Sequence, residues 1–245
     1  MNTITILNIP IHNISFEKAL VEIERMTKKS HLHQITTVNP EFLVEAQKNW
    51  EFRKVLQEAD LSLADGVGLQ LGALLQGKKF KTRIPGSGLV SRLMPEAQKK
   101  GWRVFLLGAL PGVAQTAACN LKKKYPKLKV WFSGADPDTK SSIESIKYIN
   151  KIKPHLLLVA YGAPTQDLWI AKNRDKIQAK VAIGVGGTLD FLAGRARRAP
   201  KIISKLGLEW FFRLVREPWR LKRQLKLPYY VFLLCILTRN QKDVQ

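Results

Sequence analysis

The chain has 245 residues, of which 45% are hydrophobic, so it is long enough for one large core domain with an appendage. Its 41 lysines and arginines against 19 acidic residues give a formal net charge of +22, which predicts an anionic partner. Two well-separated cysteines argue against a disulfide framework, and we expect Cys119 to lie in the core on an apolar helix face. The longest apolar run, 227–237, contains Pro228 and is shorter than the roughly 20 residues of a membrane-spanning helix.

The first sixty residues predict a strand followed by helices around a second strand. Residues 3–9 alternate like an edge strand, and Ser15 begins a helical pattern. A short strand over 35–38 ends at Asn39 and Pro40, a strong signal for a helix N-cap and its first residue. Helical spacing of apolar residues then continues to about residue 56.

A buried strand over 61–64 ends at Asp65, and Gly66 and Gly68 follow it before the next helical stretch. In an open α/β sheet, ligands collect beyond the carboxyl ends of the strands, so we expect Asp65 at the mouth of such a crevice. Gly66 and Gly68 would permit a sharp turn and close approach of a substrate. The alternative is that Asp65 only caps the following helix.

From residue 86 onward, strands and helices alternate regularly. After a basic loop at 78–83, a helix begins near Gly86 and extends to about residue 100. Strands are predicted at 103–107, 129–132, 156–160 and 181–185, and helices at 112–124, 141–152 and 165–178. This alternation predicts an α/β fold with a Rossmann-like, mostly parallel sheet and flanking helices, over residues 1–195.

Residues 196–245 form a different segment. Residues 195–245 contain 13 basic and 3 acidic residues, many aromatic side chains and no strand pattern. We predict a basic, amphipathic helical appendage that associates with a membrane. Arg213, Arg216, Arg220 and Arg223 share one helix face if the helix continues through Pro218; they could bind phosphate groups or form a solvated basic face.

Two glycine-rich loops follow predicted strands and could receive a diphosphate. Gly108 and Gly112 flank one loop but lack the full dinucleotide-binding spacing, and an ordinary tight turn explains them equally well. Gly186 and Gly187 form the second, and Asp190 could accept hydrogen bonds from a ribose or cap a helix.

The sequence favours no metal site. The Asp136-Pro137-Asp138 stretch resembles the metal-binding Asp-x-Asp of sugar-nucleotide enzymes, but its surroundings suggest a surface turn and no third carboxylate or histidine lies nearby in sequence. The four histidines show no ligand spacing.

Several segments together resemble the WecG/TagA/CpsF family, glycosyltransferase family 26. They are Thr36-Thr37-Val38-Asn39-Pro40-Glu41, Ala64-Asp65-Gly66-Val67-Gly68, Arg83-Ile84-Pro85-Gly86, the 162–169 segment with Gln166 and Trp169, Gly184-Val185-Gly186-Gly187-Thr188-Leu189-Asp190-Phe191, Arg198-Ala199-Pro200 and Leu208-Glu209-Trp210. The resemblance covers about residues 3–226. Two departures are Asp167, where the family has Glu, and Ser87, where it more often has Asp.

The resemblance implies an inverting, metal-independent transfer of N-acetylmannosamine or a related sugar from a UDP-sugar, without a cofactor. The implied acceptor is a sugar on undecaprenyl diphosphate, in the synthesis of a cell-surface polysaccharide or teichoic acid. The expected location is cytoplasmic, peripheral on the inner face of the bacterial membrane, in contact with anionic lipid. Formation of a homo-oligomer is possible, and no nucleic-acid partner is expected.

The resemblance also implies roles for individual residues. Asp65 would be the general base, Thr37 and Asn39 would orient the acceptor or Asp65, and Arg83 would offset charge on the departing diphosphate. The remaining substrate-binding candidates are Gly66, Gly108, Gln166, Gly186, Gly187, Asp190, Arg213, Arg220 and Arg223.

Two other classes of protein remain as alternatives at this stage. The net charge alone would suit a nucleic-acid-binding protein, although the sequence has no helix-turn-helix or RNA-binding signature. The glycine loops would suit a nicotinamide-dependent oxidoreductase, although the full fingerprint and its acidic residue about 20 positions later are missing.

Overall fold

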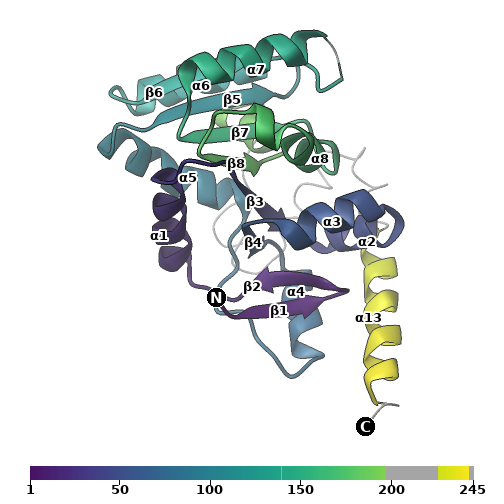
Figure 1. Ribbon diagram of the computed structural model, residues 1–245. Helices are drawn as coiled ribbons and strands as arrows, with labels where there is room; N and C mark the ends of the chain where they lie inside the picture. Colours follow the sequence, from purple (N-terminus) through teal and green to yellow (C-terminus); the bar gives the residue numbers. More distant parts are fainter. Residues whose placement is uncertain (139, 197–225, 243–245) are drawn as a thin grey trace.

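The computed structural model describes residues 1–138, 140–196 and 226–242 (Figure 1). Its strands are β1 (Thr3–Ile6), β2 (Ile9–His12), β3 (His33–Val38), β4 (Leu61–Ala64), β5 (Arg103–Gly108), β6 (Lys129–Ser133), β7 (Leu156–Ala160) and β8 (Val181–Gly184). Its helices are α1 (Phe16–Thr27), α2 (Pro40–Lys48), α3 (Trp50–Glu58), α4 (Val67–Leu74), α5 (Gly86–Lys99), α6 (Val113–Lys124), α7 (Lys140–Ile152), α8 (Thr165–Lys172), α9 (Thr188–Leu192) and α13 (Lys226–Lys242), with a 3-10 turn at Arg174–Lys176.

Six strands form one sheet in the order β4-β3-β8-β7-β5-β6, and every neighbouring pair is parallel. The prediction of a Rossmann-like parallel sheet is therefore confirmed. The single edge strand predicted over 3–9 is wrong, because the chain reverses there into the antiparallel hairpin β1-β2. Leu7 and Asn8 both have positive φ, which is the backbone of a two-residue hairpin turn.

Helices cover both faces of the sheet because its strands bury alternate side chains on each side (Figure 1). Leu156 and Leu158 of β7 pack with α1, α5, α6 and α9, whereas Leu157 and Val159 pack with α7 and α8. The hairpin, α2, α3 and α13 share a further apolar cluster. Figure 1 shows the hairpin, α4 and α13 at one end of the molecule and β6, α6 and α7 at the other.

Local capping signals set several helix ends where they were predicted. The Ser15 hydroxyl accepts a hydrogen bond from the Lys18 amide at α1, and the Asn39 side chain accepts one from the Phe42 amide at α2. The predicted helix over 165–178 instead ends at Lys172 and continues as the 3-10 turn. Cys119 is exposed rather than in the core, because α6 turns its alanines inward.

The helix α13 packs against the α/β core through a small set of contacts. Tyr230 and Leu234 are buried in the cluster of the hairpin and α2, and Lys226 pairs with Glu45 at 2.8 Å. The Tyr230 hydroxyl donates a hydrogen bond to the Gly68 carbonyl at 3.0 Å. Within the part of the chain that the structure describes, no helix has the length and apolarity needed to cross a membrane.

Packing between helices, rather than substrate approach, explains Gly68. A Cβ at this position would lie 2.4 Å from the Pro40 Cγ atom and 3.4 Å from the Tyr230 ring. The glycine therefore lets α4 lie directly against the start of α2 and against α13.

We expect the substitution Gly68→Ala to lower the free energy of unfolding by about 1–3 kcal/mol, because Pro40 is held in the first turn of α2 and cannot move aside. Chemical denaturation would measure this change. Gly134→Ala is the matched control, because a Cβ there meets no atom within 4 Å. Equal stability of the two variants would contradict this account of Gly68.

Candidate functional site

The candidate site lies at the side of the parallel sheet where the carboxyl ends of its strands meet. Because all six strands run in the same direction, their carboxyl ends meet on that side. The predicted site residues that the structure describes lie at or beyond the ends of β4, β3, β8, β7 and β5, which are consecutive neighbours in the sheet. The fold therefore brings together residues that lie up to about 150 positions apart in sequence.

Asp65 directly follows β4 and is half-buried. Its backbone amide donates to the Val38 carbonyl at 2.7 Å, which extends the pairing of β3 and β4 to the last residue before the turn. One carboxylate oxygen accepts a hydrogen bond from the Gly86 amide, the first residue of α5, at 3.3 Å. Gly66 has a φ of +106°, so the chain can turn away immediately after the carboxylate.

Thr37 also lies against Gly86, the glycine whose amide donates to the Asp65 carboxylate. A Cβ on Gly86 would lie 3.1 Å from the Thr37 hydroxyl oxygen, so this side chain and the Asp65 carboxylate both lie against the start of α5. Arg83 lies in the segment that leads to this helix and is partly exposed. Asn39 is one residue beyond β3, and its side-chain oxygen caps α2, so that atom already has a structural role.

A second group lies at the ends of β7 and β8. Gln166, in the first turn of α8, is buried, and its side-chain oxygen accepts a hydrogen bond from the Gly186 amide at 2.8 Å. A Cβ on Gly184 would lie 2.6 Å from the Gln166 amide nitrogen, so that side chain packs directly over the end of β8. This contact fixes the loop of Gly186 and Gly187, which leads into α9.

Asp190 and Gly108 lie near this group with different surroundings. Asp190 is in the first turn of α9 and is partly exposed. Gly108 ends β5 with a φ of +86°, and a Cβ there would lie 2.7 Å from the Tyr161 ring. Packing by Tyr161 therefore accounts for this glycine, and its binding role stays a prediction.

Sequence reasoning gave Asp167 no role, but the structure places it beside Gln166 in full burial. Neither of its carboxyl oxygens has a hydrogen-bond partner, and one lies 2.7 Å from where a Cβ of Gly184 would be. Burial raises the pKa of the Asp167 carboxyl to about 7, and the nearby polar groups of the Gln166 side chain and of the Asp167 backbone lower it only in part. The signal available in the sequence was its position in the α8 motif, directly after Gln166.

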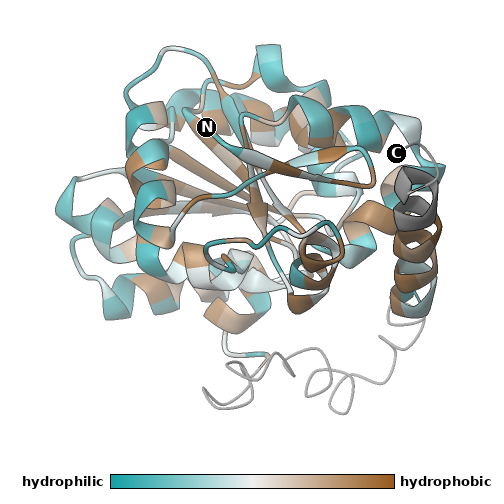
Figure 2. Cartoon of the chain, turned by 90° about the horizontal axis from the view of Figure 1, so that it is seen from below, coloured by the Kyte–Doolittle hydropathy of each residue, from teal (hydrophilic) through white to brown (hydrophobic). Residues whose placement is uncertain are grey.

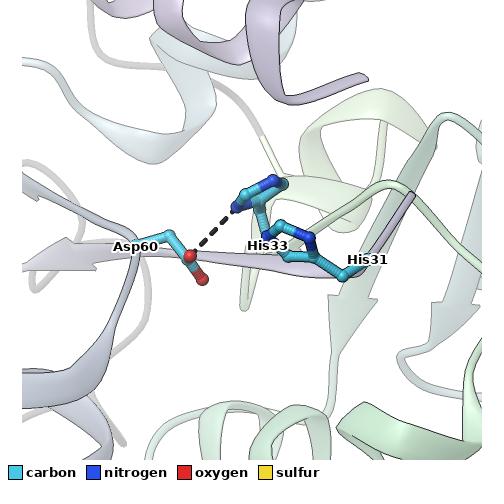
Figure 3. A group of neighbouring side chains, drawn as sticks. All are labelled: His31, His33 and Asp60. Atoms are coloured by element: carbon cyan, nitrogen blue, oxygen red, sulfur yellow. Dashed lines mark hydrogen bonds and ion pairs between the residues drawn. The ribbon is translucent and has the colours of Figure 1, made fainter. Parts of the chain in front are cut away.

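At the amino ends of β3 and β4, on the side of the sheet opposite to the candidate site, His31, His33 and Asp60 come together (Figure 3). The Asp60 carboxylate lies 3.0 Å from His33 Nδ1 and accepts hydrogen bonds from the Gln34 amide at 2.9 Å and from Arg174 at 2.7 Å. Burial alone would raise the pKa of Asp60, but these hydrogen bonds and the Arg174 charge hold it below its usual value. Both oxygens are thus occupied, so we interpret the group as a structural link between β3, the end of α3 and the 3-10 turn.

The Asp136-Pro137-Asp138 stretch lies in the loop after β6, at the outer edge of the sheet. Asp136 lines a hollow of about 440 Å³ together with Ser133, Ser141 and Glu144.

Arg213, Arg220 and Arg223 lie outside the residues that the structure describes, so their predicted roles remain predictions.

The carboxylate, the hydroxyl and the glycine loops thus lie beyond the carboxyl ends of parallel strands, which is where open α/β sheets bind their ligands. The sequence profile of the Glycosyl transferase WecG/TagA/CpsF family matches residues 4–244. The chain belongs to this family and is a glycosyltransferase, as its motifs predicted.

Three curated relatives carry the name N-acetylglucosaminyldiphosphoundecaprenol N-acetyl-beta-D-mannosaminyltransferase. The Bacillus subtilis (strain 168) protein is 32% identical over 99% of this chain and 94% of its own length. The Bacillus spizizenii protein is 33% identical over 91% and 88%, and a Staphylococcus aureus (strain MRSA252) protein is 30% identical over 86% and 83%. These comparisons do not support the nucleic-acid-binding and oxidoreductase alternatives.

We expect Asp167→Asn to stabilise the protein more at high pH than at low pH. The native carboxyl has a pKa of about 7 and the unfolded one about 3.8, so between about pH 4 and pH 7 the native state holds a proton that the unfolded state has lost. Stability contributed by this group therefore falls as pH rises, by about 2 to 3 kcal/mol between pH 5 and pH 8. Urea unfolding of both proteins at these two pH values measures it; a difference that does not change with pH would refute the assignment.

Proposed function

We propose that the protein transfers N-acetylmannosamine from a UDP-linked donor to N-acetylglucosamine carried on undecaprenyl diphosphate, with inversion at the anomeric carbon and without a metal ion. The names of the curated relatives support the transferred sugar and the acceptor. The match over nearly the whole chain supports carrying these names over to this protein.

The position of Asp65 is the observation that carries the mechanism. Its carboxylate is partly open to solvent at the carboxyl edge of the sheet, and the Gly86 amide holds one oxygen in place. In the proposed step, Asp65 takes the proton of the acceptor hydroxyl while that oxygen attacks the anomeric carbon. The bond from this carbon to the diphosphate breaks, and UDP leaves with the electron pair. One displacement gives one inversion.

The other predicted residues divide between the two substrates. Thr37 lies beside the same glycine and would orient the acceptor hydroxyl or Asp65 itself, and Asn39 would assist there. Gln166, which fixes the Gly186 loop, would hold the donor nucleotide together with Gly187 and Asp190, and Gly66 and Gly108 would contact substrate at the ends of β4 and β5.

Positive charge would replace a metal ion at the diphosphate. Arg83 lies on the segment that leads into α5, whose first amide contacts Asp65, and it would offset the charge that develops on the departing diphosphate. Each well-placed donor of this kind contributes roughly 3–4 kcal/mol to such a transition state. Arg213, Arg220 and Arg223 of the appendage would add further charge and bind the diphosphate of the lipid.

The proposed acceptor also determines a location. An undecaprenyl chain keeps its sugar at a membrane surface, so the protein would work as a peripheral protein on the inner face of the cell membrane. The net charge of +22 supports attraction to anionic lipid head groups.

We expect Asp65→Asn to lower kcat by about 10²–10⁴-fold, because the amide cannot accept the proton of the acceptor hydroxyl. The affinity for UDP, measured by calorimetry, should stay within about twofold of that of the unchanged protein, since Asp65 acts on the acceptor. Asp175→Asn, at an exposed site in the 3-10 turn, is the control and should retain full turnover. Near-normal turnover of Asp65→Asn would remove this residue from the mechanism.

We expect Gln166→Ala to act on the donor side instead. The substitution removes the oxygen that holds the Gly186 amide, so the donor loop loses its anchor. UDP should bind about tenfold more weakly, in line with about 1.4 kcal/mol for one lost hydrogen bond in a buried position. Unchanged UDP affinity would show that this loop does not bind the nucleotide.

A further inference from the structure

An apolar surface lies directly beside Asp65, on the helix α4. Its members are Val67, Leu71, Leu74 and Leu75, which are exposed by 44%, 42%, 59% and 46%. They recur every three or four positions and therefore form one stripe along α4, whereas Leu69, Gly72 and Ala73 face the core. We call this stripe, together with the neighbouring exposed residues of α13, the α4 surface.

The helix α13 extends the α4 surface because the two helices are in contact. The Tyr230 ring lies against Gly68, and its hydroxyl lies 2.7 Å from where a Cβ of Gly72 would be. The outward residues of α13 are again apolar: Tyr229, Val231, Phe232 and Ile236. Figure 2 shows that apolar residues predominate along this helix. Of the 15 large hydrophobic residues exposed in the described part of the chain, eight thus belong to the α4 surface.

The segments that form the α4 surface carry basic charge only, and the acidic residues placed beside them are Asp65, before α4, and Glu45, which pairs with Lys226. Lys78, Lys79 and Lys81 follow α4 and are exposed. Residues 66–95 contain five basic residues and no acidic residue, and residues 226–242 contain no acidic residue either. An apolar stripe bordered by lysines is the pattern of an element that lies in the interface of an anionic bilayer. A symmetric dimer through this surface would bring the same lysines together and repel.

We propose that α4, extended by α13, inserts its exposed apolar face into the surface of an anionic lipid bilayer and so sets the height of Asp65 above it. Only Gly66 separates Asp65 from the first residue of α4, so an α4 that lies in the interface places the carboxylate at the level of the lipid head groups. This inference deepens the proposed function and rests on its lipid-linked acceptor. It places membrane contact on the α/β core as well as on the C-terminal appendage.

The test uses the full chain with the double substitution Leu71→Gln and Leu74→Gln. Both side chains are exposed, so the melting temperature should not fall. Binding to vesicles of phosphatidylcholine with 30 mol% phosphatidylglycerol, measured by co-sedimentation, should weaken about tenfold. The matched control is Ile143→Gln on α7, which removes an equally exposed apolar side chain (59%) at the other end of the molecule and should not change vesicle binding.

Three results would overturn the inference. They are unchanged vesicle binding of the double variant, an equal loss in the Ile143 control, and a lipid-free dimer of the unchanged protein that the double substitution dissociates in sedimentation velocity. The last result would assign the surface to a second copy of the chain.

Turnover separates this inference from the proposed function. The double variant should keep its turnover of a short-chain, water-soluble acceptor and lose about tenfold with a vesicle-embedded acceptor. If the unchanged protein turns over neither acceptor, the proposed function fails, while the vesicle-binding result still decides the inference.

Discussion

The short turn after β4 is the constraint on which the site depends. The Asp65 amide continues the β3-β4 pairing, and the Ile84 amide bonds to the Ala64 carbonyl at 2.8 Å. The Gly86 amide then reaches the Asp65 side chain itself. Hydrogen bonds thus link the end of β4 and the turn before α4 to the start of α5. In the proposed step, a carboxylate held in this way would need little reorganisation before it accepts the proton of the acceptor hydroxyl.

Different groups hold the two proposed halves of the site in place. The proposed acceptor half rests on backbone amides around Asp65, whereas the proposed donor half rests on buried side chains, with Gln166 bonded to the Gly186 amide and Asp167 buried beside it. β3 and β8 are neighbours, so the two halves share one sheet edge. At the other edge, Asp60 ties the start of β3 to Arg174, and this network limits how far the strands can slide relative to each other.

The sequence predicted the features that depend on local patterns. Strand and helix alternation gave the parallel sheet, and the capping signals at Ser15 and Asn39 gave the helix starts. It did not predict features that depend on contacts between distant segments. Gly68 serves the packing of Pro40 and Tyr230, and the isolation of the Asp167 carboxyl depends on β8. No local periodicity records such contacts. The prediction that Cys119 lies in the core was wrong for a related reason. Contacts with the rest of the fold decide which face of α6 is buried, and the alanines of this helix, rather than Cys119, face the core.

The attachment of α13 has a consequence for the dynamics of the molecule. This helix is held by two buried side chains, Tyr230 and Leu234, and by the ion pair of Lys226 with Glu45. The hydrogen bond from Tyr230 to Gly68 spans 162 positions of sequence. A single helix packed on the surface of the core can open at a free energy below that of global unfolding. Amide hydrogens of α13 will therefore exchange with solvent sooner than those of β7 and β8, and each such opening exposes Gly68 and Gly72, against which Tyr230 lies.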